Sequence, residues 1–197
     1  QFPRLDHDPS RPRFAILHAA AGRARGLVVY VHPFGEEMNK SRRMAALQSR
    51  ALSEAGFTVL QPDLLGCGDS AGDSGDADWA TWIEDVAQAC RWLRNSCTAH
   101  GNLPMTLWGL RAGALLACEA AARLGDIQQL LLWQPALAGK AVLAQFLRLQ
   151  RAGDLLGSRT AGESGPDPRK ELTAGHAVEI AGYRIAPGLA QGLEACR

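Results

Sequence analysis

Short runs of β-branched and aliphatic residues alternate with longer amphipathic segments from residue 26 to residue 135. Strands and helices that alternate with short connections form right-handed βαβ units, so the alternation predicts a mostly parallel sheet. The runs contain few polar side chains, which predicts helices on both faces of the sheet. An earlier run fits an antiparallel strand at the edge. The predicted strands are Leu27–Val31, Phe57–Leu60, Met105–Trp108 and Leu130–Trp133, with Phe14–Ala19 as the edge strand.

The segments between these strands have apolar residues at helical spacing and predict helices over residues 44–55, 79–93 and 112–124. After residue 135 the alternation of predicted strands and helices ends. Ala141–Arg151 predicts a helix, Val178–Ile185 a small hairpin and Pro187–Ala195 a short helix, while Gly157–Lys170 has the composition of an exposed, poorly ordered loop. We therefore expect two parts: a core over residues 1–135 and a lid-like cap over residues 136–197, above the carboxyl edge of the sheet.

Composition narrows the range of partners. The 197 residues are 47% hydrophobic and carry a formal net charge of +1, so no electrostatic argument favours nucleic acid. No apolar run reaches the roughly 18 to 20 residues of a membrane span, and no basic-then-apolar signal segment begins the sequence. The five cysteines include no C-x-x-C pair and fit neither a disulfide framework nor a zinc ribbon. We expect a reduced, cytoplasmic protein with a small-molecule or acyl substrate, no metal and no cofactor; the oligomeric state stays open.

Two loops follow predicted strands at the sheet edge where ligands of parallel sheets bind. Residues 32–39 follow the first strand, and a loop at this place presents backbone N–H groups to a pocket. Taken alone, that loop is better interpreted as a simple strand-to-helix connection with Asn39 or Ser41 as the helix cap. Residues 63–70 contain Gly66 and Gly68, which permit a tight backbone path. Because no G-x-G-x-x-G opens into a helix, a nucleotide site is the least favoured interpretation.

A third loop, Gly109–Gly113, passes sharply from a predicted strand into an apolar helix. Glycines two residues before and two after the central position are typical of a nucleophile elbow, where strand and helix pass at close range. The central residue is Arg111. Arginine stays protonated at physiological pH and offers no lone pair, so Arg111 is excluded as a covalent nucleophile.

Together, the three loops resemble those of α/β-hydrolases. His32-Pro33-Phe34-Gly35 is similar to the His-Gly oxyanion loop of that superfamily, with proline in place of the first glycine; residues 63–70 match its D-x-x-G-x-G-x-S loop, and Gly109–Gly113 match its elbow apart from the nucleophile. From residue 14 onward the sequence more narrowly resembles the exosortase A system-associated hydrolase 2 family of PEP-CTERM systems, a group that also has arginine at the elbow.

The resemblance implies a three-layer α/β-hydrolase-type sandwich with a mostly parallel central sheet and a lid-like C-terminal insertion. It also implies that the last strands, which bring the catalytic acid and histidine in this fold, are missing from this sequence. The oxyanion donors would be the backbone N–H groups of Phe34 and Ala112. The other binding residues implied are His32, Gly35, Asp63 and Ser70.

Two functions stay open, of which the family resemblance favours the first. In the first, the protein hydrolyses an ester, thioester or amide in exopolysaccharide-related exosortase systems, with Glu36 or Glu37 activating water in place of an elbow serine. Cys67 and Ser70 are weaker candidate nucleophiles, because both more often shape a turn, and none of the five histidines completes a Ser-His-Asp triad. In the second, a non-catalytic protein uses Arg111 at a helix N-terminus to hold an anionic ligand.

Arg111 is predicted at the positive end of a helix, where an unpaired buried cation costs several kcal/mol. We therefore predict an acidic partner, Glu36 or Glu37 first and Asp63 or Asp69 next. The alternative is that the Arg111 side chain extends to solvent without a partner.

Overall fold

A six-stranded sheet forms the centre of the molecule, with strands in the order β1-β2-β4-β3-β5-β6. The computed structural model describes residues 1–5, 10–156 and 167–196. β2 pairs antiparallel with β4, and β3 pairs in parallel with both β4 and β5. β6 extends the parallel part beyond β5. The strands are β1 (Arg4–Leu5), β2 (Arg13–His18), β3 (Gly26–Val31), β4 (Phe57–Pro62), β5 (Met105–Leu110) and β6 (Gln129–Trp133).

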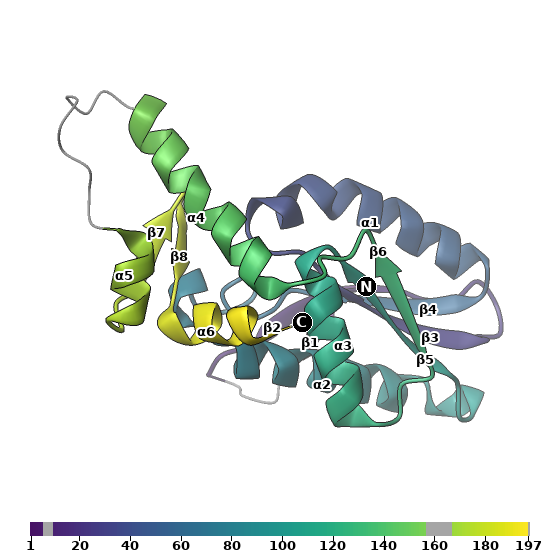
Figure 1. The fold of residues 1–197 in the computed structure, drawn as a ribbon. Coiled ribbons are helices and arrows are strands. Elements are labelled where there is room, and N and C mark those ends of the chain that lie inside the picture. Colours follow the sequence, from purple (N-terminus) through teal and green to yellow (C-terminus); the bar gives the residue numbers. More distant parts are fainter. Residues whose placement is uncertain (6–9, 157–166, 197) are drawn as a thin grey trace.

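Helices cover both faces of this sheet: α1 lies on one face, and α2 and α3 lie on the other (Figure 1). All six residues of β3 are buried, because β3 has a strand on each side and helices cover both of its faces (Figure 1). The predicted mostly parallel three-layer fold is thereby confirmed. The helices are α1 (Glu36–Glu54), α2 (Trp79–Ser96) and α3 (Ala112–Leu124), with short 3₁₀ turns at Ser74–Asp76 (η1) and Thr98–His100 (η2).

Helix α1 begins earlier than the sequence indicates. Its cap position is Gly35, at φ 57°, and Glu36 and Glu37 occupy its first turn. Asn39 and Ser41, each predicted as a cap in the simplest interpretation of the loop, lie inside the helix, so that prediction is wrong. Two carboxylates at a helix N-terminus complement the helix dipole, and glycine adopts a positive φ at low cost.

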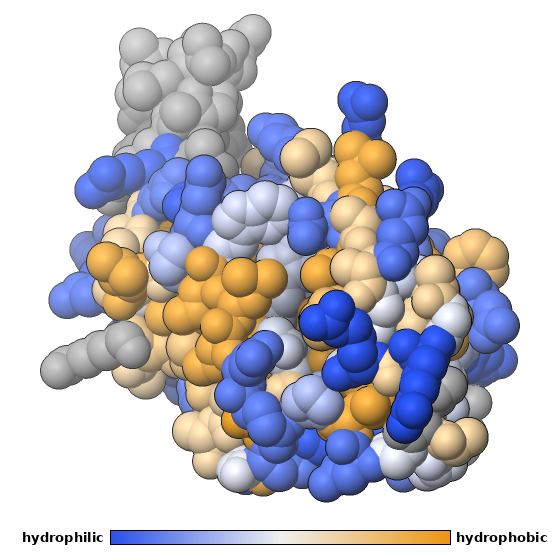
Figure 2. Space-filling view, turned by 90° about the vertical axis from the view of Figure 1, so that its right-hand side faces the viewer, coloured by the Kyte–Doolittle hydropathy of each residue, from blue (hydrophilic) through white to orange (hydrophobic). Residues whose placement is uncertain are grey.

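Strand β6 contradicts the expectation that helices cover every parallel strand on both faces. Leu130 and Leu131 are each 44% exposed, Leu132 is 39% exposed and Trp133 is 37% exposed. β6 is the outermost strand of the sheet, so one of its long edges has no strand beside it. Figure 2 shows a broad hydrophobic area on the side of the molecule that carries β6.

The elements after β6 gather at one end of the sheet, on the left of Figure 1. The predicted hairpin is confirmed, with Ile180 opposite Tyr183. Of the predicted loop Gly157–Lys170, residues 157–166 lie outside the described part. Its end is helical rather than loop, because Asp167 caps a helix that Pro168 begins. The elements are α4 (Gly139–Leu156), α5 (Pro168–Thr173), β7 (Val178–Ile180), β8 (Tyr183–Ile185) and α6 (Pro187–Ala195).

Within the described ranges, no helix is both long and apolar enough to cross a membrane. The same ranges contain no group of three or more His, Cys, Asp or Glu side chains arranged to hold a metal ion.

Candidate functional site

The turn between β5 and α3 has the geometry of a nucleophile elbow. Arg111, at its tip, adopts φ 53° and ψ −119°, a conformation that non-glycine residues rarely adopt. A Cβ atom on Gly109 would lie 2.5 Å from the Cα of Ala114, and one on Gly113 would lie 2.2 Å from the carbonyl oxygen of Val31. Both glycines are therefore required by the close approach of α3 to β5 and β3, as the sequence predicts.

Arg111 has an acidic partner from the neighbouring loop. Its Nε donates to Oε1 of Glu37 at 3.3 Å, and the two side chains are 38% and 45% exposed. This confirms the predicted pairing of Arg111 with an acid from residues 36 and 37. Because both side chains reach solvent, the pair holds Arg111 in place without burying its charge.

A small cavity of about 80 Å³ opens beside this ion pair. Two potential oxyanion donors border it, because Phe34 and Ala112 line the cavity and their backbone N–H groups donate no hydrogen bond to any residue that the structure describes. No histidine, serine or cysteine is among the described residues that line it. The lining residues are Phe34, Glu36, Glu37, Arg111, Ala112, Ala136, Val142, Gln145 and Phe146.

His32 is buried and is not among the residues that line this cavity. Its Nδ1 lies 2.9 Å from the carbonyl oxygen of Pro33, and the Leu64 N–H points to its Nε2 at 3.4 Å. Both contacts are satisfied by the neutral ring with its proton on Nδ1. Burial lowers the pKa of His32, which favours that neutral form. The ring therefore ties the loop after β3 to the loop after β4 and has no free nitrogen to act as a base.

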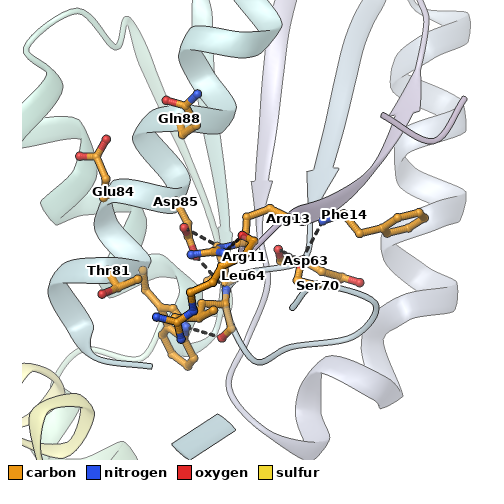
Figure 3. Close-up of polar contacts among 12 residues, drawn as sticks. Arg11, Arg13, Phe14, Asp63, Leu64, Ser70, Thr81, Glu84, Asp85 and Gln88 are labelled. Carbon is orange, nitrogen blue, oxygen red and sulfur yellow. Dashed lines mark hydrogen bonds and ion pairs between the residues drawn. The ribbon is translucent and has the colours of Figure 1, made fainter. Parts of the chain in front are cut away.

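Asp63 and Ser70 stabilise the loop after β4 and are not among the cavity-lining residues (Figure 3). The Asp63 carboxylate accepts from the Asp69 N–H at 3.0 Å and from Arg42 at 3.3 Å. Ser70 donates to the Asp63 carbonyl oxygen at 2.5 Å and accepts from the Phe14 N–H at 2.9 Å. Their predicted part in ligand binding stays a prediction, because their observed contacts hold the loop together.

Cys67 is not an activated nucleophile. Burial, reinforced by the Asp63 carboxylate, raises the pKa of its thiol to about 12. Only the thiolate attacks, so a thiol with this pKa is inert at neutral pH. The Ser70 hydroxyl both donates and accepts a hydrogen bond within the protein. Neither Cys67 nor Ser70 is therefore a substitute for the elbow serine.

A buried ion pair joins β2 to helix α2, and sequence reasoning missed it. Arg13 Nε donates to both carboxylate oxygens of Asp85 at 2.9 Å, and the side chains are 4% and 1% exposed (Figure 3). Asp85 also accepts from the Leu65 N–H at 2.8 Å. Sequence alone gives little signal for this pair, because 72 residues separate its members.

Residues after β6 cover the cavity, and these were also missed. The Phe146 ring of α4 packs edge-on against Phe34, with centroids 4.8 Å apart. The Tyr183 ring of β8 packs edge-on against the Phe146 ring, with ring centroids 6.3 Å apart. The Tyr183 hydroxyl donates to Oε2 of Glu36 at 2.9 Å. Asn39 donates to the same hydroxyl at 2.9 Å. The sequence predicts the helix over residues 141–151 and the hairpin over residues 178–185 that carry these side chains, but it gives no signal for their contacts with the loop after β3.

The comparisons with known proteins agree with this geometry. Residues 22–168 match the family model described as serine aminopeptidase, S33. None of the curated proteins matches the sequence.

Similar solved structures include esterases and a lipase. Est1E from Butyrivibrio proteoclasticus with bound ferulic acid is 21% identical, with a TM-score of 0.66 over 99% of this chain and 71% of that one. A soluble variant of monoglyceride lipase from Saccharomyces cerevisiae, in complex with a substrate analog, is 16% identical, with a TM-score of 0.67 over 99% of this chain and 66% of that one. A thermostable carboxyl esterase from Bacillus coagulans, in complex with glycerol, is 23% identical, with a TM-score of 0.59 over 87% of this chain. The chain spans only 54% of the length of that esterase.

Proposed function

Because the chain belongs to the serine aminopeptidase S33 family of α/β-hydrolases, we propose that it has a pocket for acyl compounds in which Arg111 binds a small carboxylate. The observation that carries this proposal is the half-exposed guanidinium at the elbow, where it borders a cavity without a serine, cysteine or histidine among its described lining residues. An elbow that holds a cation favours an anionic ligand.

The chemistry of the cavity matches a short carboxylate. Only the Nε of Arg111 is bonded to Glu37 among the described contacts, and a guanidinium has further N–H groups for a second anion. The free N–H groups of Phe34 and Ala112 add donors, and Ala112 starts a helix of 13 residues whose dipole favours negative charge. Phe34, Phe146 and Val142 supply apolar wall for a few methylene groups.

Hydrolysis of an ester, thioester or amide is the second candidate. The same two N–H groups are the donors that an oxyanion hole requires, and Glu36 and Glu37 are the carboxylates of the cavity that could activate water beside them. A serine-type mechanism is disfavoured in the described residues, because His32 and Ser70 are buried and hydrogen-bonded and the Cys67 thiol has a raised pKa of about 12. This chain spans only 54% and 66% of two of the similar solved structures. Hydrolytic activity like theirs is therefore a proposal for this chain.

Two finer assignments accompany this proposal. The association with exosortase A systems and exopolysaccharide is supported by the resemblance of the three loops, including Arg111 at the elbow. The division into a core (residues 1–135) and a cap (residues 136–197) is supported by the contacts of Phe146 and Tyr183 over the cavity.

Propionate is a suitable probe, because it combines one carboxylate with a short apolar chain. Calorimetric titration at low ionic strength should give a Kd that rises about tenfold to a hundredfold in Arg111→Gln, the range for losing a hydrogen bond to a charged group. Arg91→Gln is the matched control, since Arg91 is an exposed arginine on α2 paired with Glu84. An unchanged Kd in Arg111→Gln would overturn carboxylate binding by this residue.

A screen of p-nitrophenyl esters tests the second candidate. Turnover by the unaltered protein would favour hydrolysis. Arg111→Ser alone should create no esterase, because no described histidine lines the cavity to activate the new hydroxyl.

A further inference from the structure

Two adjacent carboxylates lie beside the guanidinium at the elbow. Glu36 and Glu37 both lie in the first turn of α1, and both line the cavity that Arg111 lines. Only Glu37 is paired with Arg111, at 3.3 Å. A second carboxylate on Arg111 would occupy the N–H groups that a ligand needs and would repel an incoming anion.

Glu36 is held elsewhere by a residue 147 positions away in the sequence. Its Oε2 accepts from the Tyr183 hydroxyl at 2.9 Å and from the Asn39 side-chain amide at 3.4 Å. These two bonds also lower the pKa of Glu36, with the Tyr183 hydroxyl as the larger cause. The side chain that Tyr183 holds is therefore an anion at neutral pH.

The position of Tyr183 is fixed by the rest of the hairpin. The Arg184 N–H donates to the Ser74 hydroxyl at 2.9 Å, which joins β8 to the η1 turn of the core. The Tyr183 ring contacts Phe146, which in turn contacts Phe34 beside the cavity. Tyr183 thus links the hairpin, α4 and the loop after β3.

We propose that Tyr183 is a positioning residue: its hydroxyl holds the Glu36 carboxylate away from Arg111 and so keeps the guanidinium open to an anionic ligand. This inference rests on the proposed binding of a carboxylate at Arg111. Tyr183 does not touch that ligand. It acts through Glu36, whose carboxylate accepts a hydrogen bond from the Tyr183 hydroxyl.

Three variants separate this role from a purely structural one. Tyr183→Phe keeps the ring contact with Phe146 and frees Glu36, so the Kd for propionate should rise about fivefold to twentyfold, as expected for one added charge near a partly exposed site. The double variant Tyr183→Phe/Glu36→Gln should regain the original Kd, because the freed side chain is then neutral. Tyr30→Phe is the matched control, since Tyr30 is the other tyrosine of the chain and bonds Ser41 instead.

The ¹⁵N NMR signal of the Arg111 Nε–H gives a readout that needs no ligand. The signal should shift in Tyr183→Phe, when a second carboxylate reaches the guanidinium, and return in the double variant. An unshifted signal in Tyr183→Phe, or a shift that persists in the double variant, overturns the positioning role. If the unaltered protein fails to bind propionate while the signal behaves as described, the proposed function fails and the positioning of Glu36 by Tyr183 stands.

Discussion

Removing the Asp85 carboxylate should destabilise the protein more than any change at its surface. In Asp85→Ala, the guanidinium of Arg13 stays buried with no carboxylate beside it, and the Leu65 N–H loses its acceptor. Breaking a buried ion pair by removing one partner costs about 3 to 5 kcal/mol, because the remaining charge is left without compensation. For a chain of this length, that cost corresponds to a fall in Tm of roughly 6 to 20 °C.

Urea unfolding followed by circular dichroism measures this loss as a fall in the midpoint at constant slope. The matched control is Glu84→Ala, the preceding residue on α2, which removes a surface ion pair with Arg91. Its side chain is 55% exposed, so the cost should not exceed about 1 kcal/mol. The double variant Arg13→Met/Asp85→Leu should recover most of the lost stability, since apolar residues replace the pair without leaving a charge. A loss below about 1 kcal/mol in Asp85→Ala would refute the argument that this pair is buried and unscreened.

The remaining predictions concern the elbow and the loops beside it. Gly113→Ala should lower the free energy of unfolding by more than about 2 kcal/mol in urea titrations, because the new methyl group would lie 2.2 Å from the Val31 carbonyl oxygen. Cys67, with a thiol pKa of about 12, should resist iodoacetamide at pH 8 in the native protein, whereas the exposed Cys118 is alkylated; mass spectrometry of the peptides distinguishes them. Because burial lowers the pKa of His32, the unfolded state binds more protons, so stability should fall as pH drops below the ordinary histidine pKa of 6.5. His32→Gln should flatten this dependence, and an unchanged slope would contradict it.

Local sequence patterns were sufficient to predict the parallel strands and the elbow. The strands β3, β4, β5 and β6 contain the predicted runs. A short, continuous aliphatic run between turn residues is typical of a buried strand. The elbow was recognisable because its two glycines meet a steric demand of strand–turn–helix packing. The partner of Arg111 followed from electrostatics, since a cation at a helix N-terminus requires an anion nearby and Glu37 follows the adjacent strand.

Features that depend on contacts between residues far apart in the sequence could not be predicted from the sequence. Asp85 looks like a solvated residue on an amphipathic helix, and only the fold brings Arg13 beside it. Tyr183 lies in a short hairpin whose sequence gives no indication of a contact with Glu36. The exposure of β6 was missed for a related reason: hydrophobic periodicity reports the chemistry of a strand, not whether neighbours cover it.

The bare edge of β6 has a consequence for how the protein behaves at high concentration. Natural edge strands are kept from pairing with other chains by charged residues, prolines, bulges or very short length. The five residues from Gln129 to Trp133 include no charge and no proline, and their unpaired N–H and C=O groups lie between exposed leucines. The opposite edge differs, since β1 has only two residues and one of them is Arg4. We therefore expect that residues 1–197 associate at high concentration first through β6, by pairing of this strand with another copy of the chain.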